Sequence, residues 1–244
     1  MKHVLNKNIP IPLYYQLKQW LLDQMERGEL KPGDFIPSER ELSERFEISR
    51  MTVRQALLEL VNEGKLVREK GKGTYVAEPK ISQGLLKLTS FSEDMLNRGM
   101  TPGARVVDVA VKRAPQSVQP KLNIGSREAV IIVTRVRMAD DTPMALETTH
   151  LSLSRFPALE QQDFSNTSLY QFLHDHYGVK TSFATQTMEV GLPNEREQEL
   201  LHISEDIPIL LIERVTLDEQ RAPIEFVKSI YRGDRYKLYA EMER

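Results

Sequence analysis

The chain has 244 residues, which is enough for two domains of ordinary size. Its 40% hydrophobic and 28% charged residues are globular values, while a net charge of −2 argues against an architectural nucleic-acid-binding protein. The absence of cysteine excludes disulfides, thiolate chemistry and zinc-finger sites, and no cofactor or metal site is expected. Because neither a signal peptide nor a transmembrane run is visible, a cytoplasmic protein is expected.

Three helices are predicted in the N-terminal region. The first is opened by Pro10-Ile11-Pro12 and runs to about residue 27. Ser38 and Glu41 have the spacing of a capping box for a second, short helix that ends near residue 46. Ser49 caps a third helix, expected to end at about residue 63. The short connection between the second and third helices predicts a helix-turn-helix.

The third helix has two different faces. Its apolar residues recur at helical spacing and should face a core: Val53, Ala56, Leu57 and Leu60. The opposite side carries Met51, Arg54 and Gln55, with Arg50 and Thr52 flanking them near the N-terminus. A recognition helix needs this arrangement, because its N-terminal residues reach base edges in the major groove while its back packs on the domain.

A basic β-hairpin is predicted after this helix. Residues 66–68 and 74–76 read as strands, joined by the turn Glu69-Lys70-Gly71-Lys72-Gly73. Glycines permit positive φ at such a tip, and lysines suit contacts with phosphates or the minor groove. Helix-turn-helix and hairpin together predict a winged helix. A charged helical corner beside an ordinary hairpin is the alternative interpretation.

The motif PSERELSERFEISRMTVRQAL, followed by NEGKLVREKGKGTYV, resembles the DNA-binding domain of the gluconate-repressor (GntR) family of bacterial transcription regulators. The resemblance implies contacts with double-stranded operator DNA from residues of the helices and the wing. The implied residues are Arg40, Arg50, Thr52, Arg54, Lys72 and Gly73. On this basis residues 1–78 are expected to form a winged-helix domain and residues 79–88 a linker.

The remainder, residues 89–244, is predicted to be an α+β domain that binds an effector and dimerises. Strands and helices alternate there in a pattern that suits an antiparallel sheet. Strands are expected at 105–112, 129–138, 144–153, 182–190, 209–217 and 224–231, and helices at 90–98, 168–176 and 195–201.

An internal repeat supports this organisation. The segments LNIGSREAVIIVTRVRM (122–138) and LHISEDIPILLIERVTL (201–217) align without gaps at an offset of 79 residues. Each is followed by a polar turn, a proline (Pro143 or Pro223) and another strand. Two related strand–turn–strand units in one antiparallel sheet, with approximate two-fold symmetry, are therefore predicted.

A pair of arginines marks the first candidate binding site. Strand alternation puts Val133, Arg135 and Arg137 on one face, where residues two apart lie roughly 7 Å from each other. Two guanidinium groups at that spacing suit a single phosphate. A solvated sheet face is the alternative. Because Arg135 aligns with Arg214 in the repeat whereas Arg137 aligns with Thr216, Arg137 is the better functional candidate.

Hydroxyl-rich helix starts and two isolated carboxylates complete the candidate site. Thr89-Ser90 and Asn166-Thr167-Ser168 each precede a predicted helix, whose free N–H groups suit an anion unless they are simply well capped. Glu147 and Glu225 sit in mainly apolar strands and need partners there, either a sugar or a nearby arginine.

The region after Leu88, including LTSFSEDM, TRVRMADDTPMALETTHL and KSIYRGDRY, resembles the effector domain of the histidine-utilisation-repressor (HutC) branch of the family. This resemblance implies a chorismate-lyase-like fold with an antiparallel sheet flanked by helices. Within the branch, the chain most strongly resembles repressors of N-acetylglucosamine utilisation. That similarity implies phosphate contacts from Ser90, the backbone of Phe91, Arg135, Arg137, Ser168 and Tyr170, and sugar contacts from Glu147, Glu225 and Tyr231.

The expected function is that of a homodimeric repressor that binds a palindromic operator. Its effector would be glucosamine 6-phosphate or N-acetylglucosamine 6-phosphate. A different effector, either another sugar phosphate or a carboxylate, is the main alternative, and a chorismate-lyase-like enzyme is a second. Since no nucleophile–base pair or metal cluster is visible, no catalytic residue is assigned.

Overall fold

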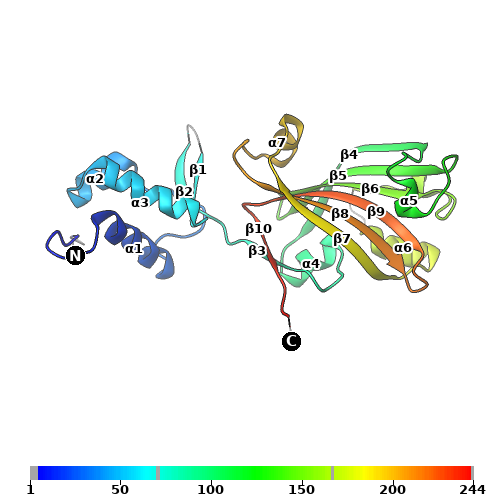
Figure 1. Cartoon of the computed structure of the whole chain (residues 1–244), viewed down its shortest axis with the longest axis horizontal. Coiled ribbons are helices and arrows are strands. Elements are labelled where there is room, and N and C mark those ends of the chain that lie inside the picture. The colour runs from blue at the N-terminus through cyan, green and yellow to red at the C-terminus, as the bar shows by residue number, and fades with distance from the viewer. Residues whose placement is uncertain (1–4, 70–71, 166–167, 243–244) are drawn as a thin grey trace. The chain divides into compact units, whose positions relative to one another are not determined.

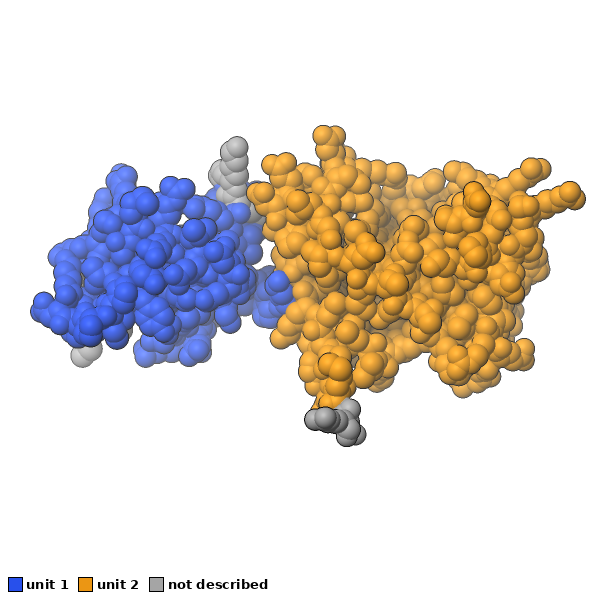
Figure 2. Space-filling model, in the orientation of Figure 1, with its two compact units in different colours: residues 1–80 blue, residues 81–244 orange. Residues whose placement is uncertain are grey.

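The computed structural model describes residues 5–69, 72–165 and 168–242. The chain divides into two compact units, Met1–Lys80 and Ile81–Arg244, which Figure 2 distinguishes by colour. Each unit has its own hydrophobic core. Among the described residues, no helix combines the length and apolar character needed to span a bilayer.

The first unit is a winged helix, as predicted. Its helix-turn-helix is made by α2 and α3, and its wing by the antiparallel pair β1–β2. The capping box of Ser38 and Glu41 is present, and Glu47 turns the chain with a left-handed φ of 52°. The elements are α1 (Leu13–Glu26), α2 (Glu39–Phe46), α3 (Arg50–Asn62), β1 (Leu66–Glu69) and β2 (Gly73–Val76).

The core of this unit fixes the orientation of α3. Val53 and Leu60 of α3 are fully buried with Leu17 and Leu21 of α1. Burial of such aliphatic side chains contributes about 1.5–3 kcal/mol each. The predicted apolar stripe of α3 therefore faces inward, and the opposite side of the helix is left for solvent.

The second unit contains a six-stranded antiparallel sheet in the order β4-β5-β6-β9-β8-β7 (Figure 1). All six strands that the sequence predicts are present. Their bounds are β4 (Pro102–Arg113), β5 (Ala129–Ala139), β6 (Thr142–Ser152), β7 (Thr181–Gly191), β8 (Ile209–Asp218) and β9 (Pro223–Arg232).

The sheet has approximate two-fold symmetry, which confirms the internal repeat. The order reads the same from either edge once β4, β5 and β6 are matched with β7, β8 and β9, and Thr148 pairs with Lys228 near the centre. The short helices α5 (Gln119–Leu122) and α7 (Glu195–Leu201) precede the matching strands β5 and β8. Both helices end at a left-handed residue, Asn123 and His202, that lies 79 positions from its counterpart.

Helices cover both faces of the sheet. On one face, Leu122 of α5 packs with Val130 and Phe226, and Leu201 of α7 packs with Val136 and Leu146. The opposite face packs against α4 (Phe91–Asn97) and α6 (Leu169–Tyr177), through Met95 and Leu173 respectively. The second face is the one that carries Arg135 and Arg137, between the two clusters.

Part of the expected linker is a strand of the second unit. Residues 81–84, inside the linker expected at 79–88, form β3 (Ile81–Gly84), which pairs in parallel with β10 (Tyr236–Tyr239). The sequence did not predict β3, β10, α5 or the short 3₁₀ helix at Leu159–Gln161. Each has only three or four residues, too few for a periodic pattern to be read.

Candidate functional sites

The exposed side of α3 is the candidate DNA interface. Arg50, Met51, Arg54 and Gln55 are all exposed, while Val53 is buried between them. The structure therefore places two of the predicted DNA contacts, Arg50 and Arg54, on one open helix face. An arginine on such a face can donate two hydrogen bonds to the O6 and N7 of guanine.

The N-terminus of α3 is tightly capped. Ser49 accepts from the Thr52 N–H at 3.1 Å, and the two hydroxyls are 2.8 Å apart. The Thr52 hydroxyl therefore already has a hydrogen-bond partner within the helix cap. To contact a DNA base it would have to share or give up that hydrogen bond. Arg40, on α2, is exposed and lies 3.7 Å from Glu44, an ion pair that water screens.

The wing contributes the last predicted DNA contacts. Lys72 and Gly73 are exposed, and Gly73 has a φ of 123°, which an L residue rarely adopts. Positive φ at the hairpin tip, which the sequence predicts, is thus present at Gly73. The other two tip positions, Lys70 and Gly71, lie outside the described residues.

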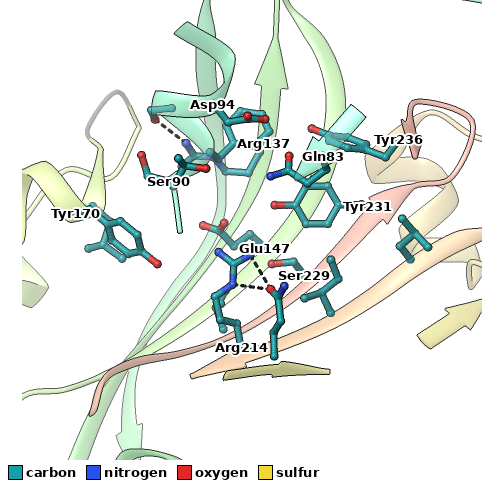
Figure 3. A pocket seen from close by; sticks show the side chains of 18 of the residues that line it. Gln83, Ser90, Asp94, Arg137, Glu147, Tyr170, Arg214, Ser229, Tyr231 and Tyr236 are labelled. Carbon is teal, nitrogen blue, oxygen red and sulfur yellow. Dashed lines mark hydrogen bonds between the residues drawn. The ribbon is translucent and has the colours of Figure 1, made fainter. Parts of the chain in front are cut away.

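The second unit contains a pocket on the face of the sheet between α4 and α6. Figure 3 shows Arg137, Glu147, Tyr170 and Arg214 directed into it from different elements. Its walls are the strands β5 to β9, the N-terminal ends of α4 and α6, and the strands β3 and β10. All nine residues of the predicted effector site line it: Ser90, Phe91, Arg135, Arg137, Glu147, Ser168, Tyr170, Glu225 and Tyr231.

Arg135 and Glu147 form a buried ion pair on the floor of the pocket. Arg135 is 2% exposed, and its Nη2 donates to Glu147 Oε1 at 2.6 Å. Burial by itself would raise the pKa of Glu147, but the charges of Arg135 and Arg137 hold it below its usual value. Within the described residues, Nε and Nη1 of Arg135 have no partner. These two donors can reach a ligand without breaking the pair.

Arg137 is buried beside the first turn of α4. It is 4% exposed, donates from Nη2 to the Ser92 hydroxyl at 3.0 Å, and lies 4.7 Å from the centre of the Phe91 ring. Burial lowers the pKa of Arg137, although that of arginine is high enough for the charge to persist. Its Nε has no partner among the described residues. The solvated sheet face considered as an alternative is therefore excluded.

Two helix N-termini meet this group of charges. At α4, Ser90 and Glu93 form a capping box, so the Ser90 hydroxyl oxygen accepts from the Glu93 N–H at 3.2 Å. Ser90, Phe91 and Ser92 all line the pocket. At α6, Ser168 is the N-cap residue but makes no side-chain capping bond. The adjoining Asn166 and Thr167 lie outside the described residues.

Glu225 lies near α6 and is hydrogen-bonded to two hydroxyl groups. It is 3% exposed and accepts from the Tyr170 hydroxyl at 2.6 Å and from the Thr216 hydroxyl at 3.0 Å. Burial raises the pKa of Glu225 above its usual value, which favours the neutral acid. The pocket therefore holds an ionised carboxylate paired with Arg135 and, near α6, a carboxyl group whose pKa is raised.

Sequence reasoning did not assign Arg214 to the site. Its Nε and Nη2 donate to a single acceptor, Gln186 Oε1, at 3.0 and 2.9 Å, and both residues line the pocket. The signal was present, because Arg214 aligns with Arg135 in the repeat. Gln83 and Tyr236 also line the pocket, but they come from the short strands that the sequence did not predict.

A winged helix followed by a domain whose pocket is lined by several charged and polar side chains defines a class: transcription regulators that read DNA with one domain and a small molecule with the other. Within the described residues, no group of three histidine or acidic side chains could hold a metal ion.

Comparison with known proteins identifies the family. A model described as "UTRA domain" matches residues 97–237, and one described as "Bacterial regulatory proteins, gntR family" matches residues 13–76. The chain belongs to the GntR family, and its second domain is a UTRA domain, as in the HutC branch. It is a regulator rather than an enzyme.

Individual relatives agree with this assignment. The HTH-type transcriptional repressor NagR of Bacillus subtilis (strain 168) is 43% identical over 240 residues, which are 98% of each chain. The mannosyl-D-glycerate transport/metabolism system repressor MngR of Escherichia coli (strain K12) is 37% identical and covers 93% of this chain and 94% of its own length. The crystal structure of PhnF from Mycobacterium smegmatis has a TM-score of 0.65 and 34% identity over 94% of this chain and 98% of that one.

Proposed function

We propose that this protein is a homodimeric repressor whose effector is glucosamine 6-phosphate or N-acetylglucosamine 6-phosphate. Without effector, the dimer would bind a palindromic operator through its two copies of α3. A protein with two-fold symmetry matches the two half-sites of such an operator. Effector binding in the pocket would release the DNA. The observation that carries the proposal is a single pocket that combines three arginines and two helix N-termini with hydroxyl and carboxyl groups.

The charges of the pocket favour a dianion. Three arginines line it, Arg135, Arg137 and Arg214, against two glutamates. Glu147 is ionised and paired, whereas the raised pKa of Glu225 favours its uncharged form. The further acid in the wall, Asp94, is paired with Arg98 at 2.9 Å. The excess positive charge that remains suits the two negative charges of a phosphate monoester.

The phosphate is assigned to the end formed by α4. Arg137, the ring of Phe91 and the N-terminus of α4 lie together there, and the Arg137 Nε is available. Backbone N–H groups at a helix start and a guanidinium group form a common phosphate site. Ser168 and Tyr170, from the start of α6, would complete the contacts.

The sugar is assigned to the carboxylates and Tyr231. Glu147 and Glu225, whose buried carboxyl group has a raised pKa, can bind hydroxyl or amino groups. Burial raises the pKa of Tyr231 to about 12, so this phenol also stays a neutral donor. One carboxylate could serve either the free or the acetylated amine, so both sugars belong to the proposal.

Fluorescence anisotropy on promoter DNA from the protein's own locus tests the proposal. Labelled DNA is bound by the full chain and then titrated with each sugar phosphate and, as a control, with glucose 6-phosphate and inorganic phosphate. We expect release by at least one amino sugar at concentrations where the controls do nothing. Specific DNA binding that neither amino sugar changes would contradict the effector assignment and leave the regulator assignment intact. Light scattering of the same sample checks the dimer.

A further inference from the structure

The C-terminal strand β10 forms part of the pocket wall. Tyr236 and Leu238 of β10 line the pocket together with Gln83 and Gly84 of its parallel partner β3. Figure 3 shows Gln83, Tyr231 and Tyr236 grouped on one side of the pocket. The first and last strands of the second unit thus meet at the site where the effector is proposed to bind.

The Tyr236 hydroxyl is an unused polar group in this wall. Tyr236 is 4% exposed, and its Oη has no hydrogen-bond partner among the described residues. The ring packs edge-on against Tyr231 with the centroids 4.8 Å apart, so the side chain is held in place. Leaving a buried hydroxyl unpaired costs free energy of folding. A group kept in place at such a cost is a candidate for a partner that arrives from outside.

Several charged and ionisable groups surround Tyr236. Burial, followed by the neighbouring Tyr231 and Asp94, raises the pKa of Tyr236, while the charges of Arg98 and Arg137 act in the opposite direction. The phenol is therefore neutral, and its O–H can donate a hydrogen bond to an anionic oxygen. Tyr236 and Arg137 line the same pocket.

The strand β3 is fastened to this region from two sides. Its backbone pairs with β10, with Ile81 N–H donating to Arg235 O at 2.7 Å and Leu85 N–H donating to Tyr239 O at 2.9 Å. On the other side, Nη2 of Arg98, the C-cap residue of α4, donates to the Ser82 carbonyl at 2.8 Å. Since β3 is the first element after the winged-helix unit in the chain, anything that fixes α4 and β10 also fixes the point where that unit is attached.

On the basis of the proposed function, we infer that the Tyr236 hydroxyl hydrogen-bonds the sugar-phosphate effector and thereby links effector occupancy to the β10–β3 pair. The ligand would bridge α4, through Arg137, and β10, through Tyr236. Both elements hold β3, so a bound effector narrows the conformations that β3 can adopt. That restriction is one part of the coupling between effector and operator binding.

Tyr236→Phe tests the contact, and Tyr239→Phe is the matched control. Tyr239 lies on the same strand but is 55% exposed, and its hydroxyl donates to Glu241 at 3.4 Å. For each full-length variant we would measure the melting temperature without ligand, the affinity for both amino sugar phosphates by calorimetry, and the factor by which saturating effector weakens operator binding.

For Tyr236→Phe we expect an unchanged or higher melting temperature without ligand, because an unpaired buried hydroxyl is removed. Effector affinity should fall roughly tenfold, the loss of one hydrogen bond to a charged group, and the coupling factor should shrink. Tyr239→Phe should match the wild type throughout.

Three outcomes would overturn the inference. Effector affinity within twofold of the wild type would show that Tyr236 is not a contact. A lower melting temperature without ligand would show that the hydroxyl already has a structural partner. Weaker effector binding with an unchanged coupling factor would overturn the link to β3. If the wild-type protein binds neither sugar phosphate, the proposed function fails, and this inference fails with it.

Discussion

Arg135 and Arg214 occupy equivalent positions on β5 and β8, yet Arg135 donates to the carboxylate of Glu147 and Arg214 to the amide oxygen of Gln186. The first arginine is neutralised by its partner and the second is not. Positive charge is therefore distributed unequally over a pocket whose scaffold is nearly symmetric. The position aligned with Arg137 is Thr216, so the first half carries a second arginine where the second half carries a hydroxyl group.

Arg137→Ala should abolish the response to effector and leave operator binding intact. The substitution removes the buried guanidinium between Ser92 and Phe91, and charge-assisted hydrogen bonds contribute about 1.5–3 kcal/mol each. We expect at least tenfold weaker binding of amino sugar phosphates, measured by calorimetry. Arg105→Ala, an exposed arginine on the adjacent β4, is the control and should bind effector normally. Loss of operator binding in Arg137→Ala would contradict the separation of the two sites.

Arg54→Ala should have the reverse effect. Arg54 is exposed in the middle of the α3 face, and a bidentate arginine–guanine contact discriminates by about 1–3 kcal/mol. Operator affinity should fall at least tenfold in anisotropy titrations, with effector affinity unchanged. The control is Arg27→Ala, which removes the same charge from the end of α1. If both variants weakened DNA binding equally, only the overall charge of the unit would matter, and the recognition-helix assignment would be wrong.

Ser90→Ala and Asn194→Ala form a matched pair. Both residues cap a seven-residue helix through a complete capping box, but only Ser90 lines the pocket. Each substitution should reduce the free energy of unfolding by about 1 kcal/mol. Effector affinity should fall for Ser90→Ala alone, because its helix start is assigned to the phosphate. Equal affinities in the two variants would show that the start of α4 does not bind the ligand.

Glu225→Gln and Glu147→Gln should shift stability in opposite directions at neutral pH. Burial raises the pKa of Glu225 above its usual 4.5, so the folded protein holds this proton more tightly than the unfolded chain. The stabilisation that this proton contributes is fully present below the usual pKa of 4.5. It is lost as the pH rises through the pKa of Glu225 in the folded protein. Glu225→Gln should therefore be at least as stable as the wild type at pH 8. Its free energy of unfolding, measured with urea, should also fall less between pH 5 and pH 8 than that of the wild type.

Glu147 follows the opposite rule, because Arg135 and Arg137 hold its pKa below 4.5. Its contribution is present above that value and is lost as the pH falls through the folded pKa. Glu147→Gln leaves Arg135 without its ionised partner and should destabilise the protein by about 3–5 kcal/mol at pH 7. Equal changes in the two variants would contradict the opposite pKa directions.

The sequence predicted the large elements because each carries a periodic or capping signal. Val53 to Leu60 marked the buried side of α3, and the aligned segments around Arg135 and Arg214 marked β5 and β8. It could not predict β3 or β10, whose few residues pair only through contacts more than 150 positions apart in the chain. The pocket residues Gln83 and Tyr236 were missed for that reason.

The joining of two similar halves in one chain has a consequence for what the pocket can recognise. A pocket formed across a true dyad by two identical subunits must show the same groups to both ends of its ligand. Here the two halves are separate segments of one sequence, so their residues can differ at equivalent positions. Arg137 of the first half is equivalent to Thr216 of the second, and Glu225 of the second is equivalent to Ala145 of the first. A single polypeptide can thus distinguish the head of a ligand from its tail, which a symmetric dimeric site cannot do.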